Sequence, residues 1–72
     1  MIILNTEHMQ TLFLELQSYE NQGITIWLEG FISTPMHVTS QISLNEENLY
    51  MRDYIFDEGV LKEVRFDKIS NT

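Results

Sequence analysis

The segment NQGITIWL, residues 21–28, decides the fold, because the spacing of the apolar residues changes there from that of a helix to that of a strand. Before it, apolar side chains recur every three or four residues, which predicts an amphipathic helix over about residues 6–21. Gly23 fits the position after the last helical turn, where the left-handed conformation disfavours residues with a Cβ atom. Beyond it, apolar and polar or aromatic residues alternate, as expected of a strand with one buried face.

Three more strands are expected downstream of this first one. Ser33-Thr34-Pro35 is typical of a loop, since proline lacks the amide donor that a sheet ladder needs. The next segment alternates apolar and polar residues, with an interruption at Ser40 on its inner side. A type I turn with a glycine would make Asp57-Glu58-Gly59 a three-residue hairpin loop. The predicted strands cover about residues 24–30, 36–44, 49–56 and 60–69.

These elements predict an α+β fold in one domain, residues 1–72. Every predicted connection is short, and none is long enough for the crossover of a parallel pair. We therefore expect the N-terminal helix to pack on a four-stranded antiparallel meander. The alternative is a strongly bent sheet that closes into a small SH3-like or Sm-like barrel, with a bend at Gly30.

The sequence alone does not decide how the two strands of the last hairpin are paired in register. Its sequence, YMRDYIFDEGVLKEVRFDKI (residues 50–69), contains all four basic residues of the chain together with five acids. A three-residue loop would set Asp53 opposite Glu63, which is a mildly unfavourable pair. A shift of one residue would instead set Asp53 opposite Lys62 and Arg52 opposite Glu63.

The net charge of the chain limits the kinds of molecule that it is expected to bind. Eleven acids against four bases give a net charge of −7, which repels phosphate and so argues against direct binding to nucleic acid or to anionic membranes. No apolar run approaches the roughly 20 residues of a membrane span. A protein with a basic surface is the partner that the charge leaves open, although a net charge of this size also serves simply to keep a small protein dispersed in solution. The absence of cysteine and of a basic leader fits a cytoplasmic protein.

The sequence predicts no catalytic, cofactor-binding or metal-binding residue. His8 and His37 have no second ligand at metal-binding spacing. The adjacent acids at residues 46–47 and 57–58 lack the spacing of a calcium loop, and the three glycines stand too far apart for a phosphate loop. We therefore expect a protein that is not an enzyme.

Aromatic residues supply the candidate interface. If the apolar residues of the first strand face the helix, its tryptophan points the other way. One helix cannot cover both faces of a four-stranded sheet, so either a barrel buries the second face or an aromatic patch is exposed. The predicted function is a small regulatory or adaptor protein that binds another protein. The expected anchors are Trp27, Phe31, Tyr50, Tyr54 and Phe56.

Two other classes of function stay open. One is an acidic inhibitor, such as a phage-encoded one, that imitates the charge of DNA in the basic groove of a nucleic-acid enzyme. Its carboxylates would come from Glu7, Glu15, Glu20, Glu29, Glu46 and Glu47. The other is a homo-oligomeric structural protein, with a homodimer as the simplest form, paired through an open strand edge or the second sheet face.

Three short motifs resemble YolD-like proteins, a family of small Sm-like-barrel proteins of Gram-positive bacteria and their mobile elements. They are QGITIWLEG at residues 22–30, HVTSQISL at residues 37–44 and the closing VRFDKI at residues 64–69. The resemblance covers about two thirds of the chain and lacks the longer helical N-terminal portion of that family. It implies an accessory or regulatory protein, linked in that family to DNA-repair polymerases, and it identifies no catalytic residue.

Overall fold

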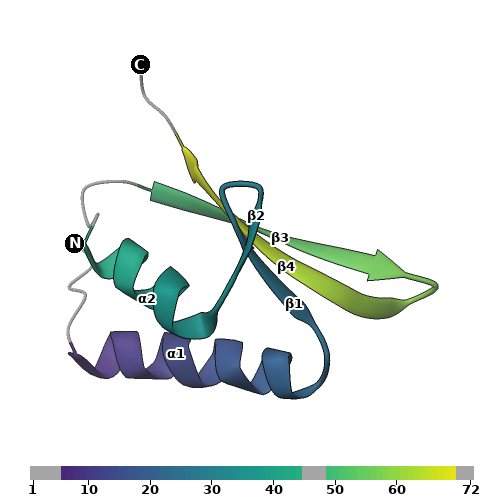
Figure 1. Ribbon diagram of the computed structural model, residues 1–72, viewed down its shortest axis with the longest axis horizontal. Coiled ribbons are helices and arrows are strands. Elements are labelled where there is room, and N and C mark those ends of the chain that lie inside the picture. Colours follow the sequence, from purple (N-terminus) through teal and green to yellow (C-terminus); the bar gives the residue numbers. More distant parts are fainter. Residues whose placement is uncertain (1–5, 45–48, 70–72) are drawn as a thin grey trace.

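The computed structural model describes residues 6–44 and 49–69, which form two helices and four strands (Figure 1). In chain order the elements are α1 (Thr6–Asn21), β1 (Thr25–Leu28), β2 (Phe31–Ser33), α2 (Pro35–Leu44), β3 (Leu49–Asp57) and β4 (Val60–Ile69). The predicted α+β class is confirmed. The helix expected over residues 6–21 is present as α1, and the last two expected strands are present as β3 and β4.

The four strands form one mixed sheet in the order β2-β1-β4-β3. β1 and β2 form an antiparallel hairpin, and so do β3 and β4, but the two hairpins meet through a parallel pairing of β1 with β4. The expected all-antiparallel meander is therefore wrong at its centre. The barrel is wrong as well, because the sheet stays open, with β2 and β3 at its edges.

The segment predicted as a strand over residues 36–44 is the helix α2, and its first turn shows why. The hydroxyl of Thr34 accepts a hydrogen bond from the amide of His37 at 3.1 Å, which is the bond of a helix N-cap. Pro35 follows at the first helical position, where its missing amide costs nothing. Pro35, Val38 and Ile42 face the core at i, i+3 and i+7 spacing, which matches a helix.

The end of α1 follows the expected glycine stop. Gly23 has a φ of 83°, and its amide donates to the carbonyl of Glu20 at 3.0 Å. The amide of Ile24 donates to the carbonyl of Tyr19 at 3.0 Å. These two bonds satisfy carbonyls at the helix end and turn the chain directly into β1.

Both hairpins turn through two residues that have positive φ. The values are 52° and 84° for Glu29 and Gly30, and 52° and 79° for Glu58 and Gly59. Two such residues in succession are the signature of a type I′ turn, whose twist matches that of the strands. The first strand therefore ends at Leu28, before the expected residue 30, and the predicted three-residue loop of the last hairpin is wrong.

The last hairpin also contains a bulge. Glu63 lies opposite Ile55, whereas Leu61 lies opposite Phe56, the next residue of β3, so Lys62 is the extra residue. The bulge and the two-residue turn together change the register.

Asp53 consequently lies opposite Arg65, so both registers considered from the sequence are wrong. In the observed register a carboxylate faces a guanidinium on the same face of the sheet. Opposite charges at directly facing positions favour the pairing of the two strands.

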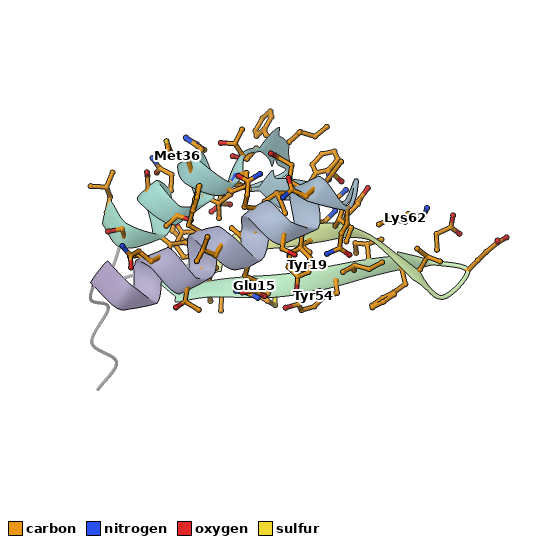
Figure 2. The ribbon with its side chains drawn as sticks, turned by 90° about the horizontal axis from the view of Figure 1, so that it is seen from below. Glu15, Tyr19, Met36, Tyr54 and Lys62 are labelled. Atoms are coloured by element: carbon orange, nitrogen blue, oxygen red, sulfur yellow. The ribbon has the colours of Figure 1, made fainter. Side chains whose placement is uncertain are left out.

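The core lies between the two helices and one face of the sheet (Figures 1 and 2). Each of the two helices contributes a fully buried side chain, Leu16 from α1 and Val38 from α2. The central strands β1 and β4 and the residue just before β1 supply the rest of the hydrophobic core, which consists of Ile24, Ile26, Leu28, Val64 and Phe66. The opposite face of the sheet is covered by no element that the structure describes.

Candidate protein interface

We call the face of the sheet that points away from α1 and α2 the open face. Because side chains alternate along a strand, it carries the residues between the buried positions. It consists of Thr25 and Trp27 on β1, Ile32 on β2, Met51, Asp53 and Ile55 on β3, and Glu63, Arg65 and Asp67 on β4.

Trp27 and Arg65 form the centre of the open face. They are partners in the parallel ladder, and the guanidinium carbon of Arg65 lies 4.2 Å from the centroid of the Trp27 ring. The indole nitrogen donates to the hydroxyl of Thr25 at 3.0 Å, and Arg65 Nε donates to Glu63 Oε1 at 2.8 Å. Stacking and these two bonds hold both side chains in one arrangement.

Exposed apolar side chains flank this centre on both sides. Ile32, the partner of Trp27 on the edge strand β2, is 66% exposed. On the same face, toward the opposite edge of the sheet, Met51 and Ile55 of β3 are 49% and 40% exposed. The open face thus has an aromatic and cationic centre with apolar side chains toward both edges.

The charge of the open face is negative. Asp53, Glu63 and Asp67 contribute three carboxylates, and Arg65 contributes the one cation that register and alternation place there. Arg65 is already bonded to Glu63, so the carboxylates outnumber the cation around the tryptophan. A partner with basic groups at the rim of its contact surface would match this distribution.

The five residues expected at the interface do not share one surface. Trp27 lies on the open face, as the alternation of β1 indicates. Tyr50 and Tyr54 lie opposite Lys68 and the buried Val64, respectively, on the side of the helices. Residues 50, 52, 54 and 56 share one face of β3, and it is the face opposite to that of Trp27.

Phe31 and Phe56 are exposed at the margins of the helix side. Phe31 lies opposite the buried Leu28 and is 76% exposed, beside His37 at the rim of the sheet. Phe56 lies opposite Leu61 and is 59% exposed, near the turn of the last hairpin. Neither phenylalanine adds to the open face.

Tyr54 belongs to a polar cluster that joins β3 to α1 (Figure 2). Arg52 Nη1 donates to Glu15 Oε2 at 2.7 Å and to the hydroxyl of Tyr54 at 2.9 Å. The hydroxyl of Tyr19 donates to the same Glu15 oxygen at 3.1 Å. Burial, and then the hydrogen bond and charge of Glu15, raise the pKa of Tyr19 to about 12. Burial acts to lower the pKa of Arg52, but the hydrogen bonds to Tyr54 and Glu15 together outweigh it, so the pKa is raised.

Sequence reasoning missed Ile32, Met51, Ile55 and Arg65 as members of the candidate interface. Polar and apolar residues alternate strictly over residues 63–67, which could have placed Arg65 on the face away from the core. The parallel pairing of β1 with β4 is what brings Arg65 beside Trp27, and no signal in the sequence marked that pairing.

The described residues show no arrangement for metal chemistry, since no group of three or more histidine and acidic side chains among them could hold an ion. His37 is exposed on α2, and the side chain of His8 lies outside the described part. In the part that the structure describes, no helix is long and apolar enough to cross a bilayer.

No model of a protein family, no curated protein and no solved structure matches the chain. The resemblance to YolD-like proteins stays a prediction. Of its three motifs, HVTSQISL lies in α2 and not in the strand that was predicted over residues 36–44.

Proposed function

We propose that this protein is a small non-enzymatic adaptor or regulator that binds another protein through the open face. The observation that carries the proposal is the fixed Trp27–Arg65 stack at the centre of a sheet face that no described element covers. Aromatic and arginine side chains contribute much of the binding energy at protein interfaces, especially near the centre of the contact. Their arrangement before binding lowers the entropy that association costs.

The partner is a protein with an apolar centre and basic residues around it. Its apolar centre would contact Trp27 together with Ile32 on one side and Ile55 on the other. Its basic residues would meet Asp53 and Asp67, which flank the arginine on neighbouring positions of the open face. The overall charge of −7 would speed the encounter with such a surface.

The DNA-mimic alternative receives less support from the positions of the acids. Carboxylates occur on α1, in both hairpin turns and on the open face, so they do not form one row. The acidic residues whose side chains the structure describes are Glu15, Glu20, Glu29, Asp53, Asp57, Glu58, Glu63 and Asp67. Glu15 is paired with Arg52, and Glu29 accepts a bond from the amide of Lys68 at 2.9 Å. The side chain of Glu7 and residues 46–47 lie outside the described part.

A capture experiment with matched variants tests the proposal. The purified protein is immobilised and exposed to a lysate of its native host, and retained proteins are identified by mass spectrometry. The chain carrying Trp27→Ala is compared with the chain carrying Phe31→Ala, which also removes a large aromatic side chain but on the other side of the sheet. Circular dichroism checks that both variants fold.

We expect a partner that the unmodified protein and Phe31→Ala retain and that Trp27→Ala loses. Its affinity is then measured from about 50 to about 500 mM salt, where screening weakens contacts between exposed charges. Moderate weakening supports an interface with an aromatic centre and a charged rim. Equal retention by a folded Trp27→Ala chain contradicts the proposal. Equal retention combined with steep loss in salt would favour the DNA mimic.

A further inference from the structure

The sheet has one long edge, which is formed by β3. Along its outer side β3 pairs with no other segment that the structure describes. It has nine residues, whereas β2 at the opposite edge has three. Short strands, prolines and bulges are common means by which proteins keep an edge from pairing, but β3 contains no proline and the bulge of its hairpin lies in β4. Alternate residues of such a strand turn their amide and carbonyl outward, where another strand can bind them.

Large side chains of β3 are exposed on both faces of the sheet. Met51 and Ile55 lie on the open face, whereas Tyr54, which is 42% exposed, and Phe56 lie on the side of the helices. The backbone of α1 approaches the sheet mainly at β1, two strands away from this edge. A further strand beside β3 would therefore cover apolar surface on both faces, and the helix layer leaves room for it.

Symmetry and charge decide whether β3 of a second copy can be that strand. In a two-fold contact between antiparallel edge strands, the axis is perpendicular to the sheet, so residues that face each other lie on the same face. The registers that pair most of β3 have this axis at residue 52, 53 or 54. The first sets Arg52 opposite its own copy, and the second does the same with Asp53. Like charges at directly facing positions are unfavourable, which leaves the axis at Tyr54.

With the axis at Tyr54, each charged residue of β3 faces an uncharged one. Over residues 51–57 the facing pairs are Tyr54 with Tyr54, Arg52 with Phe56, Asp53 with Ile55, and Asp57 with Met51. The guanidinium of Arg52 would lie beside the ring of Phe56, and such a contact between a cation and an aromatic ring is attractive. The sequence of β3 is thus complementary to itself in this register.

We propose that two copies of this chain pair through β3 in antiparallel orientation, with the two-fold axis at Tyr54, and so form one continuous sheet. Main-chain hydrogen bonds between the two edge strands supply the attraction, and the facing charges set the register. The net charge of −7 on each copy opposes their approach. Salt screens this repulsion, so the dimer strengthens as the salt concentration rises.

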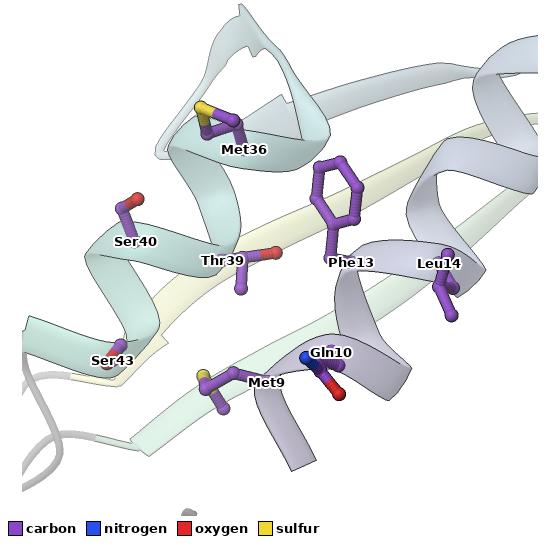
Figure 3. Close-up of a pocket in the computed structure, with 8 residues that line it drawn as sticks. All are labelled: Met9, Gln10, Phe13, Leu14, Met36, Thr39, Ser40 and Ser43. Carbon is purple, nitrogen blue, oxygen red and sulfur yellow. The ribbon is translucent and has the colours of Figure 1, made fainter. Parts of the chain in front are cut away.

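The dimer leaves the other surfaces of the chain accessible. Both open faces lie on the same side of the joined sheet, because the axis is perpendicular to it. A groove of about 680 Å³ lies between α1 and α2, and its described lining, which includes Met9, Phe13 and Met36, contains no residue of β3 (Figure 3). The dimer is therefore independent of the proposed function, and Trp27→Ala should leave it intact.

Sedimentation over a concentration series tests both the dimer and its register. We expect a monomer–dimer equilibrium that strengthens between about 50 and about 500 mM salt. Ile55→Lys sets a cation opposite Asp53 of the other copy, whereas Ile55→Glu sets a carboxylate there. Each dimer contains this pair twice, so the dissociation constants of the two variants should differ by about tenfold or more, with the lysine variant binding more tightly.

Ile32→Lys and Ile32→Glu are the matched controls, since they make the same changes at the opposite edge of the open face. Their dissociation constants should differ far less, because only the net charge of the chain changes. Circular dichroism checks that all four variants fold, since Glu63 of the same chain also faces Ile55. A chain that stays monomeric at every concentration overturns the proposal. An equal difference between the lysine and glutamate variants at the two positions overturns it as well.

Disulfide formation supplies a second test of the register. The chain has no cysteine, so a single introduced thiol reports one position. Tyr54→Cys places two thiols at the axis, where facing Cα atoms are about 4.5 to 5.5 Å apart and a disulfide can form. Asp53→Cys places each thiol opposite Ile55 of the other copy instead. Under mild oxidation Tyr54→Cys should give a covalent dimer much faster than Asp53→Cys or the exposed Lys62→Cys. Equal or faster linkage through residue 53 overturns the proposal.

Discussion

Arg52 Nη1 of the edge strand β3 lies 2.7 Å from Glu15 Oε2 of α1, and these two residues are 37 positions apart in the sequence. The same guanidinium stands over the ring of the buried Phe66, with 5.0 Å between its carbon and the ring centroid. Arg52 thus connects the outermost strand to the first helix and to the central strand β4. The main contact of β3 with the rest of the molecule is its pairing with β4.

Replacing Glu15 with glutamine should lower the free energy of unfolding by about 1 kcal/mol, near the upper end for ion pairs that solvent reaches. The side chains of Arg52 and Glu15 are 30% and 35% exposed, so water screens the pair in part. Urea denaturation measures the difference. Glu20→Gln on the exposed side of α1 serves as the control and should change the free energy by less than about 0.5 kcal/mol. Equal effects of the two variants would show that the pair contributes nothing specific.

The Tyr19 hydroxyl predicts a loss of stability at alkaline pH. Its pKa is raised in the folded chain from 10.0 to about 12, so folding favours the protonated phenol. The stabilisation is complete below the unfolded pKa and is lost as the pH rises from about 10 to about 12. Tyr19→Phe should therefore show a shallower decline in the free energy of unfolding over that window. Absorbance of the phenolate should show that an ionisation near pH 12 is missing in this variant. An unchanged decline would contradict the assignment.

Thr34→Ala should destabilise the chain by about 1 kcal/mol, because the amide of His37 loses its N-cap acceptor. Thermal unfolding followed by circular dichroism at 222 nm measures the effect. Ser40→Ala, an exposed position in the middle of α2, provides the control and should be neutral or slightly stabilising, since alanine favours helices. If Thr34→Ala were no worse than Ser40→Ala, the hydroxyl would not act as a cap.

The two hairpin turns predict opposite results for the same substitution. Glu58 has a φ of 52°, a conformation that asparagine adopts more readily, so Glu58→Asn should raise the free energy of unfolding by about 0.5 kcal/mol. Glu29 has the same φ, but its carboxylate accepts a hydrogen bond from the amide of Lys68 at 2.9 Å. Glu29→Asn shortens that side chain and should give no gain or a loss. Denaturation of both variants side by side makes the comparison, and equal gains would contradict the role of the Glu29 bond.

Local signals in the sequence were enough for α1, its glycine stop and the existence of the last hairpin. They were misleading over residues 36–44. The alternation of apolar and polar residues there favours a strand, whereas Thr34-Pro35 just before it favours the start of a helix. The polar Ser40 interrupts that alternation, whereas the spacing of Pro35, Val38 and Ile42 fits a helix without interruption. The cap and the proline were the signals that pointed to a helix, and the prediction of a strand followed the alternation instead.

The parallel pairing of β1 with β4 could not be predicted, because it depends on an element that was assigned to the wrong type. With α2 as a strand, no connection was long enough for a crossover. The same pairing decides the candidate site, since it sets Trp27 beside Arg65 and places Tyr54 on the helix side. Side-chain alternation predicts which residues of one strand share a face. It does not predict which faces of different strands lie on the same side of the sheet.

The parallel junction also has a consequence for the order of folding. Each hairpin closes through a two-residue turn and depends on contacts between near neighbours, which form within microseconds. Joining β1 to β4 brings together segments that are 38 residues apart, such as Thr25 and Glu63, and costs far more loop-closure entropy. We therefore expect the docking of the two hairpins to limit the folding rate. Substitutions at Ile26 or Val64 should then slow refolding more than substitutions in either turn.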